Sequence, residues 1–246
     1  MIDIHSHLLV GVDDGCDTLA KSRELLIEAI NEGISDVCLT PHFSRVDEYM
    51  CKVDVLKRRF EQLKEYCVDL KVNLYLGNEL MIENDLDELL LANQVLSLNN
   101  SKYVLVEFPF DGYKSEYDEY LMNIALSGYK IIIAHPDRYP YSIDNPEKYI
   151  ERKWINNGYY IQCNQNSLND SKRRKLVFDL IENKQVHFIC SDAHNKQRPL
   201  SLKNAYDVIA KKFNKEVSDI LFERNARHVL NNENIESIPS VKRRLF

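Results

Sequence analysis

Residues 1–7 of the chain read MIDIHSH, and this pattern predicts a β-strand that carries two histidines on one face. In an extended strand, residues two apart point to the same side, so His5 and His7 would project together while Ile2 and Ile4 face the other way. Two imidazoles held on one face of a rigid strand provide half of a metal site. The alternative is a chance pair of histidines near a terminus, and the positions of the other histidines and acids decide between the two.

Short apolar runs alternate with amphipathic segments along the rest of the chain. In the first amphipathic segment, Thr18 is a candidate N-cap and Gly33 a candidate C′ glycine. Strands that alternate with helices form a parallel sheet, and seven of them favour a closed α/β barrel over an open sheet. The runs rich in β-branched residues, predicted as strands, are 2–8, 36–40, 72–76, 103–108, 129–134, 159–163 and 186–190.

The domain organisation follows from the absence of any linker rich in proline, glycine or serine, which predicts a single domain. We expect the barrel to occupy residues 1–230 and a C-terminal tail to occupy residues 231–246, because the last stretch has no clear periodicity. Its basic run, residues 242–244, is typical of a solvated tail.

The composition excludes several classes of protein. A formal net charge of −6 over 246 residues argues against binding to nucleic acid, which needs a basic surface. No run of about eighteen apolar residues is present, so no membrane insertion is expected. The N-terminus enters a strand without a basic region or an apolar signal core, which indicates a cytoplasmic protein. Six scattered cysteines without C-x-x-C spacing indicate reduced thiols.

Histidine, aspartate or glutamate ends six of the seven predicted strands. The C-terminal ends of parallel strands lie at one end of a barrel, where barrel enzymes place their active sites, so these side chains are expected to meet. Each residue alone could be an ordinary loop residue, but five of the seven histidines fall at such positions. His187, in the seventh predicted strand, and His228, in a late helix, are assigned no role. The candidates are His5, His7, His42, Glu79, Glu107, His135, Asp192 and His194.

This set is larger than one metal ion requires. A tetrahedral zinc ion takes four ligands and a six-coordinate ion takes a mixed nitrogen and oxygen set, so two or three ions are expected, with Glu79 bridging a pair. Ions about 3.5–4 Å apart are the usual device for phosphoester hydrolysis. The Asp13-Asp14-Gly15 stretch after the first strand adds carboxylates near the same mouth, although an ordinary Asp-Gly turn explains its spacing equally well.

In its ordered motifs the chain resembles the polymerase and histidinol phosphatase (PHP) superfamily, and the resemblance runs to about residue 226. Within that superfamily, the first two motifs together are similar to the bacterial protein-tyrosine phosphatases of capsule and exopolysaccharide loci. The motifs are Asp3-x-His5-x-His7, Val12-Asp13-Asp14-Gly15, Pro41-His42, Gly77-Asn78-Glu79, Glu107-Phe108, Ala134-His135-Pro136-x-Arg138-Tyr139 and Ser191-Asp192-x-His194-Asn195.

The resemblance implies a distorted (β/α)7 barrel, TIM-like, with a three-metal centre. Manganese would be the metal, with iron, zinc and magnesium left open by the ligand types. The first ion would be held by His5, His7, Glu79 and Asp192, the second by Glu79, Glu107 and His135, and the third by Asp14, His42 and His194. Arg138 and Arg198 would bind the phosphate, which suits the charge-assisted bonds of a guanidinium; the alternative for both is a surface salt bridge.

The implied activity is hydrolysis of phosphotyrosine on a partner bacterial tyrosine kinase of polysaccharide synthesis, by attack of a metal-bound hydroxide. A cysteine mechanism is disfavoured, because no cysteine is followed by an arginine six positions later. Two alternatives stay open at this point. The same centre could serve a small-molecule phosphatase acting on histidinol phosphate or a similar ester. The chain could also be a non-catalytic, metal-stabilised regulator, although all nine candidate ligands are present.

Overall fold

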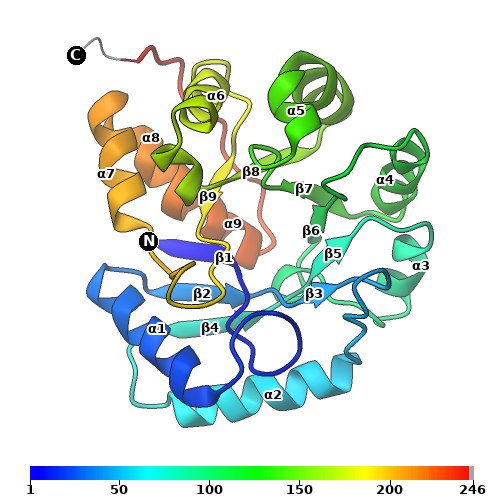
Figure 1. Cartoon of the computed structure of the whole chain (residues 1–246), viewed down its shortest axis with the longest axis vertical. Coiled ribbons are helices and arrows are strands. Elements are labelled where there is room, and N and C mark those ends of the chain that lie inside the picture. Colours follow the sequence, from blue (N-terminus) through cyan, green and yellow to red (C-terminus); the bar gives the residue numbers. More distant parts are fainter. Residues whose placement is uncertain (244–246) are drawn as a thin grey trace.

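A computed structural model describes residues 1–243 of the chain. Strands occupy the centre of the molecule and helices surround them (Figure 1). The strands are β1 (Ile2–Ser6), β2 (Asp36–Leu39), β3 (His42–Phe43), β4 (Asn73–Leu76), β5 (Glu79–Met81), β6 (Tyr103–Glu107), β7 (Lys130–Ala134), β8 (Tyr160–Asn164) and β9 (Phe188–Cys190). The α-helices are α1 (Leu19–Asn31), α2 (Val53–Tyr66), α3 (Leu86–Leu91), α4 (Glu116–Leu126), α5 (Pro140–Asp144), α6 (Ser171–Glu182), α7 (Lys203–Lys212), α8 (Lys215–Asp219) and α9 (Asn225–Leu230). Shorter helical turns are η1 (Leu98–Asn100), η2 (Glu147–Trp154), η3 (Ile155–Asn157), η4 (Gln165–Asn169) and η5 (Ile220–Arg224).

The strands pair in parallel in two sheets, with orders β1-β2-β4 and β3-β5-β6-β7-β8-β9. The first and last strands are also joined, since Ser6 forms an isolated parallel bridge with Ala193 and the His7 amide donates to the Ala193 carbonyl at 2.7 Å. These observations confirm the predicted α/β class with parallel strands, and a strand overlaps each of the seven predicted ranges.

The predicted strands 36–40 and 72–76 are followed by short continuations that the sequence analysis missed. After Pro41 the chain of β2 continues as β3, and after Gly77 and Asn78 the chain of β4 continues as β5. These two continuations pair with each other in the second sheet. Pro41 lacks the N–H that a ladder needs, which favours a break at this point. The interruption divides the strands between two sheets.

Local sequence signals set the ends of α1 as predicted. The Thr18 hydroxyl accepts a hydrogen bond from the Lys21 amide at 3.3 Å, which satisfies one of the free N–H groups of the first turn. Gly33 has a φ of +90°, a left-handed conformation that glycine adopts without the steric cost of a Cβ.

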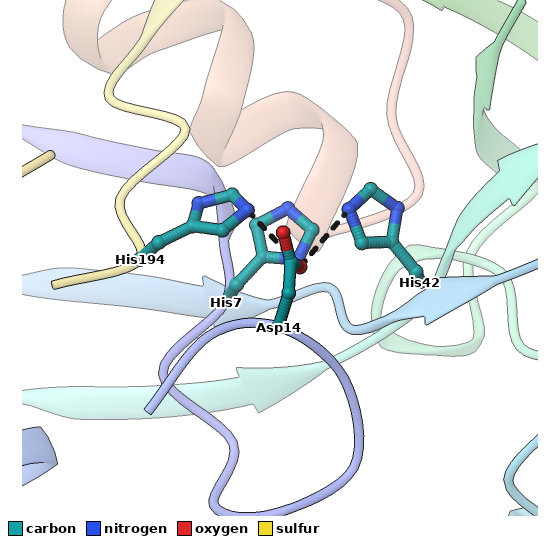
Figure 2. A group of neighbouring side chains, drawn as sticks. All are labelled: His7, Asp14, His42 and His194. Atoms are coloured by element: carbon teal, nitrogen blue, oxygen red, sulfur yellow. Dashed lines mark ion pairs between the residues drawn. The ribbon is translucent and has the colours of Figure 1, made fainter. Parts of the chain in front are cut away.

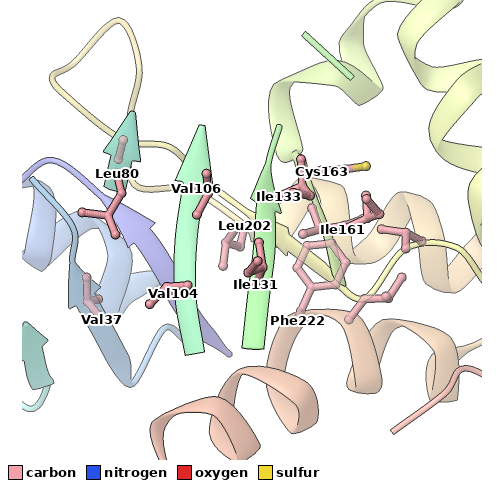
Figure 3. Packing of buried hydrophobic residues seen from close by; sticks show 14 of the residues in the cluster. Val37, Leu80, Val104, Val106, Ile131, Ile133, Ile161, Cys163, Leu202 and Phe222 are labelled. Carbon is pink, nitrogen blue, oxygen red and sulfur yellow. The ribbon is translucent and has the colours of Figure 1, made fainter. Parts of the chain in front are cut away.

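Both faces of the central strands are buried. In β6, Val104 and Val106 pack in a large outer cluster that includes residues of the surrounding helices, while Tyr103 and Leu105 belong to a second cluster with Ile132. Figure 3 shows Val104 and Val106 beside Ile131 and Ile133 of the neighbouring β7. Burial on both faces is typical of parallel strands covered by helices, and it provides the rigid support on which residues at the strand ends are placed.

The segment after α9 packs on the barrel more than the sequence suggested. Ile238 is buried, and the Arg243 guanidinium pairs with the carboxylates of Asp179 and Glu182 on α6. The expectation that the basic run 242–244 is solvated is therefore wrong for Arg243, because two carboxylates of α6 lie within reach of its guanidinium. Arg244 and the last two residues lie outside the described residues, and the boundary at residue 230 stays a prediction.

None of the helices within residues 1–243 combines the length and apolar character that crossing a membrane requires. All six cysteines, which lie between Cys16 and Cys190, are free thiols.

His187, which directly precedes β9, is expected to make the folded protein sensitive to acid. Its Nδ1 accepts a hydrogen bond from the Ile161 amide at 3.0 Å, and burial lowers its pKa to about 4. The unfolded chain binds a proton near pH 6.5 whereas the folded chain does not, so stability is complete above pH 6.5 and falls as the pH is lowered towards 4. We expect a loss of about 2 kcal/mol at pH 5 relative to pH 8 from this residue.

The measurement is urea denaturation of wild type and His187→Asn at pH 5 and pH 8. The asparagine oxygen can accept the same amide bond but does not titrate, so the variant should lose less stability on acidification. Equal losses in the two proteins would contradict the prediction.

Candidate metal centre

The structure gathers the nine predicted ligands near the ends of β1, β6, β7 and β9, at the first residues of β3 and β5, and in the loop after β1. They form four groups, in each of which one potential ligand atom per residue lies within 4.8 Å of the others. One group is shown in Figure 2, where Asp14 lies between His42 and His194 with His7 behind it. The four groups are His7, Asp14, His42 and His194; His5, His7 and Asp192; His5, Glu79 and His135; and His42, Glu79 and Glu107.

Glu79, the first residue of β5, is at the centre of this arrangement and is fully buried. Its Oε2 lies 3.1 Å from Nε2 of His5, 3.2 Å from Nε2 of His7 and 3.2 Å from Nδ1 of His42. Its Oε1 lies 2.8 Å from Nε2 of His135. One carboxylate therefore contacts four histidines, which lie in or directly after β1, β3 and β7. This is expected of a group that bridges two ions.

Asp192, two residues after β9, connects the histidines to the arginines. Its Oδ1 is 3.6 Å from Nε2 of both His5 and His7. Its Oδ2 pairs with the Arg138 guanidinium and lies 2.6 Å from Nη2 of Arg198. The two arginines predicted from the resemblance thus converge on one carboxylate oxygen.

The grouping of ligands by distance differs from the expected one. Glu79 and His135 share a group with His5, and Glu107 shares a group with His42, so Glu107 and His135 do not form one set with Glu79. His7 also joins Asp14, His42 and His194. The difference arises because Glu107, at the end of β6, points its Oε1 to within 2.7 Å of His42 Nδ1.

Two of the candidate ligands have an unusual backbone conformation. The φ angles of His135 and Asp192 are +32° and +54°, in or near the left-handed region that side chains with a Cβ rarely adopt. Such conformations cost free energy and persist where the surroundings impose them, often at functional sites. Each residue lies just beyond the end of a buried strand, where the chain turns sharply towards the centre.

Three polar residues without a predicted role hold candidate ligands in place. Oδ2 of Asp13 lies 2.8 Å from His7 Nδ1 and also accepts the His42 amide at 3.0 Å. Oε1 of Gln162 lies 2.9 Å from His5 Nδ1. Asn164 donates to Oδ2 of Asp192 at 2.9 Å. The available signal was an amide side chain at 162, in the otherwise apolar predicted strand 159–163, and a second amide at 164 directly after it.

These contacts also determine which histidine nitrogens are available. The Gln162 amide oxygen can only accept, so in the neutral form of His5, the form that binds a metal, Nδ1 carries the proton and Nε2 presents a lone pair to the centre. The Asp13 carboxylate has the same effect on His7. Oriented imidazoles of this kind are typical of metal ligands.

The charges in the cluster shift several pKa values in the absence of cations. Burial lowers the pKa of His5, but the charges of Glu79 and Asp192 outweigh burial and raise it to about 9. Burial and the nearby Arg138 lower the pKa of His135 to about 4. Burial opposes ionisation of Glu79, but the surrounding histidines hold its pKa well below the usual range.

The donor set fits divalent cations. Oε2 of Glu79 is buried and accepts no hydrogen bond within residues 1–243, although three ring nitrogens lie within 3.2 Å of it. Nε2 of His5 and Nε2 of His7 face each other at 3.3 Å. Nε2 of His194 is likewise buried with no hydrogen bond among the described residues. Lone pairs that converge in this way need a shared cation, and mixed imidazole and carboxylate ligands suit manganese, iron or zinc.

The cluster forms the floor of a cavity of about 540 Å³. Arg138 and Arg198 line it, and their side chains are 27 % and 33 % exposed. The apolar side chains of Val46, Met81 and Phe110 also line this cavity. A small anionic ligand can therefore reach the two guanidinium groups and the histidine and carboxylate floor at the same time.

Gly15 is the position in the 11–16 loop where a side chain cannot be accommodated. A Cβ there would lie 1.9 Å from the His7 carbonyl oxygen, which is backbone and cannot move freely. We expect Gly15→Ala to displace Asp13 and Asp14 and to weaken metal binding about 10- to 100-fold, as for other residues that orient ligands. Calorimetric titration with Mn²⁺ measures this. Gly112→Ala is the matched control, since a Cβ there meets nothing within 4 Å; equal affinity in the two variants would refute the prediction.

Comparison with known proteins places the chain in a family. Residues 1–231 match the model of a family described as capsular polysaccharide synthesis, CpsB/CapC. The chain belongs to the CpsB/CapC family. It is 33 % identical over 252 residues to the tyrosine-protein phosphatase YwqE of Bacillus subtilis, covering 99 % of this chain and 98 % of that protein. It is also 33 % identical to the tyrosine-protein phosphatase CpsB of Streptococcus agalactiae serotype III, covering 96 % and 100 %.

Solved structures agree with this membership of the CpsB/CapC family. A structure described as YwqE from Bacillus subtilis and CpsB from Streptococcus pneumoniae, unique metal-dependent tyrosine phosphatases, superposes with a TM-score of 0.90, 30 % identity and full coverage of both chains. The phosphotriesterase from Mycobacterium tuberculosis superposes with a TM-score of 0.59 at 12 % identity, covering 94 % of each chain, which shows similarity of fold alone.

Proposed function

We propose that this chain is a metal-dependent protein-tyrosine phosphatase. The observation that carries the proposal is the position of Glu79, which contacts four histidines on the floor of a cavity that two arginines line. Membership of the CpsB/CapC family and similarity to named tyrosine phosphatases over nearly the whole chain support the same function.

The arginines are proposed to bind the phosphoryl group. Each guanidinium offers five N–H donors, so those not used by Asp192 remain available to phosphoryl oxygens. Asp192 aligns both arginines through Oδ2, and Asn164 donates to the same oxygen, so the carboxylate is fully engaged on that side. This arrangement orients the arginines before substrate arrives, which lowers the cost of ordering them on binding.

The metal set is proposed as His5, His7, Asp14, His42, Glu79, Glu107, His135, Asp192 and His194, with two or three ions and manganese as the first candidate. Bound divalent cations would activate the attacking water and neutralise charge on the phosphoryl oxygens. Asp13 and Gln162 keep Nε2 of His7 and His5 directed at the centre, so the ligands are in place without rearrangement.

A thiol nucleophile is not supported by the cysteines of the chain. None of them lines the cavity within the described residues. Burial raises the pKa of Cys16 to about 12, and burial also raises the pKa of Cys163 and Cys190 well above the usual range. A thiolate, which the cysteine mechanism needs, is therefore disfavoured at neutral pH.

A bacterial tyrosine kinase of polysaccharide synthesis is proposed as the source of the phosphotyrosine substrate, since the family is named for capsular polysaccharide synthesis. A cytoplasmic location is proposed with it, because six free thiols suit a reducing compartment.

The test compares hydrolysis of a phosphotyrosine peptide and of histidinol phosphate by the protein loaded with Mn²⁺. The proposal expects the peptide to be the better substrate in kcat/KM, and expects activity to disappear on chelation and to return with the metal. Preference for histidinol phosphate would favour a small-molecule phosphatase. If the metal-loaded protein hydrolysed neither ester, a non-catalytic regulator would become the better explanation.

A further inference from the structure

Two aromatic side chains line the cavity, and each one is stacked on a different histidine of the metal centre. The ring of Tyr49 lies parallel to His42, with centroids 5.7 Å apart and an interplanar angle of 16°. The ring of Phe110 lies parallel to His135, with centroids 6.3 Å apart and the same angle. Both residues line the cavity above the candidate ligands.

Tyr49 is held by a small hairpin between β3 and α2. Ser44 and Tyr49 form an antiparallel bridge with hydrogen bonds in both directions, at 2.9 and 2.8 Å. The Ser44 hydroxyl donates to Asp47 at 2.6 Å, which closes the turn. The hairpin also places Val46, 83 % exposed, at the cavity wall. The backbone of Tyr49 is thus fixed by the hairpin before any ligand binds.

Phe110 comes from the loop after β6 and is packed against three partners. Besides His135, it contacts the Arg138 guanidinium, whose central carbon lies 5.2 Å from the ring centroid, and the Tyr139 ring at 5.2 Å. It nevertheless remains 45 % exposed. A large apolar ring that is rigidly packed but open to the cavity offers a contact surface beside a phosphate-binding arginine.

We propose that Tyr49 and Phe110 determine the specificity of the site for aryl over alkyl phosphate esters by contacting the ring of the substrate. This inference rests on the proposed phosphatase function. When the phosphoryl group is at Arg138, the group esterified to it extends into the part of the cavity lined by Tyr49, Phe110, Val46 and Met81. A flat aromatic ring gains stacking and apolar contact there, whereas a serine side chain is too short to do so.

The test measures binding rather than turnover, so that leaving-group chemistry does not enter. The ligands are benzylphosphonate, in which a methylene replaces the ester oxygen of an aryl phosphate, and ethylphosphonate, which lacks the ring. Calorimetry on the Mn²⁺-loaded protein should show tighter binding of benzylphosphonate. Phe110→Leu and Tyr49→Leu should each weaken its binding about three- to tenfold and leave ethylphosphonate within about twofold. Phe110→Tyr and Tyr49→Phe, which keep an aromatic ring, should bind benzylphosphonate as the wild type does.

Tyr66→Leu is the matched control, because Tyr66 is 47 % exposed at the end of α2 and lies outside the cavity lining. Equal weakening of both ligands would overturn the inference, since it would mean that the rings act only by supporting Arg138 and the histidines. No change for either ligand would overturn it as well. Failure of the wild-type protein to hydrolyse any aryl phosphate would refute the proposed function and, with it, the inferred specificity. Normal hydrolysis of aryl phosphates, with no selective loss of benzylphosphonate binding in the two leucine variants, would refute the inference alone.

Discussion

Replacing Glu79 by glutamine is expected to remove at least one metal ion per chain and to lower kcat/KM on a phosphotyrosine peptide by at least about 100-fold. Glutamine keeps the shape of the side chain but loses the negative charge and presents an amide N–H₂ in place of one oxygen. Because the carboxylate lies within 3.2 Å of His5, His7, His42 and His135, a single neutralisation affects the ligands of more than one ion.

The measurement is metal content per chain together with steady-state hydrolysis, both made with Mn²⁺ supplied. Glu83→Gln is the matched control: it is the same substitution four residues later, and Glu83 pairs with Arg45 outside the cavity lining. Arg45 keeps its pair with Asp85 in this variant, so activity should change by no more than about twofold. Full metal content and activity in Glu79→Gln would contradict the assignment of Glu79 as a bridging ligand.

Replacing Arg138 by alanine is expected to lower kcat/KM by about 100- to 1000-fold while metal content stays unchanged. The side chain reaches the cavity and pairs with Asp192, so its loss removes phosphate contacts but none of the candidate ligands. Arg138→Lys should recover only part of the activity, since an ammonium group cannot form the paired bonds of a guanidinium.

Arg23→Ala is the control for this second variant. Arg23 is 26 % exposed, close to the 27 % of Arg138, and makes a two-pronged pair with Asp69 away from the cavity. Its removal should leave hydrolysis unaffected. If Arg138→Ala instead lost metal, the arginine would act by stabilising Asp192, and the proposed phosphate-binding role would be wrong.

Much of the fold was predictable because its signals are local. Alternation of apolar runs and amphipathic segments predicted each of the seven strands, and Thr18 and Gly33 marked the ends of α1. The continuations β3 and β5 were missed because a strand of two or three residues beyond a break has too few residues for a period to appear. The packing of Ile238 and Arg243 was missed because it depends on partners that are distant in the sequence.

Part of the site was also predictable from local signals, and part of it depends on contacts between distant residues. The sequence alone determined that histidines and carboxylates end the parallel strands, and this placement brings them to one end of the barrel whatever the loops do. Only the tertiary structure decided that Glu79 contacts four histidines, that Glu107 is directed to His42, and that both arginines meet at Asp192. The physical reason is that the positions of the strands are encoded by short-range periodicity, whereas the distances between side chains depend on how residues far apart in the chain pack together.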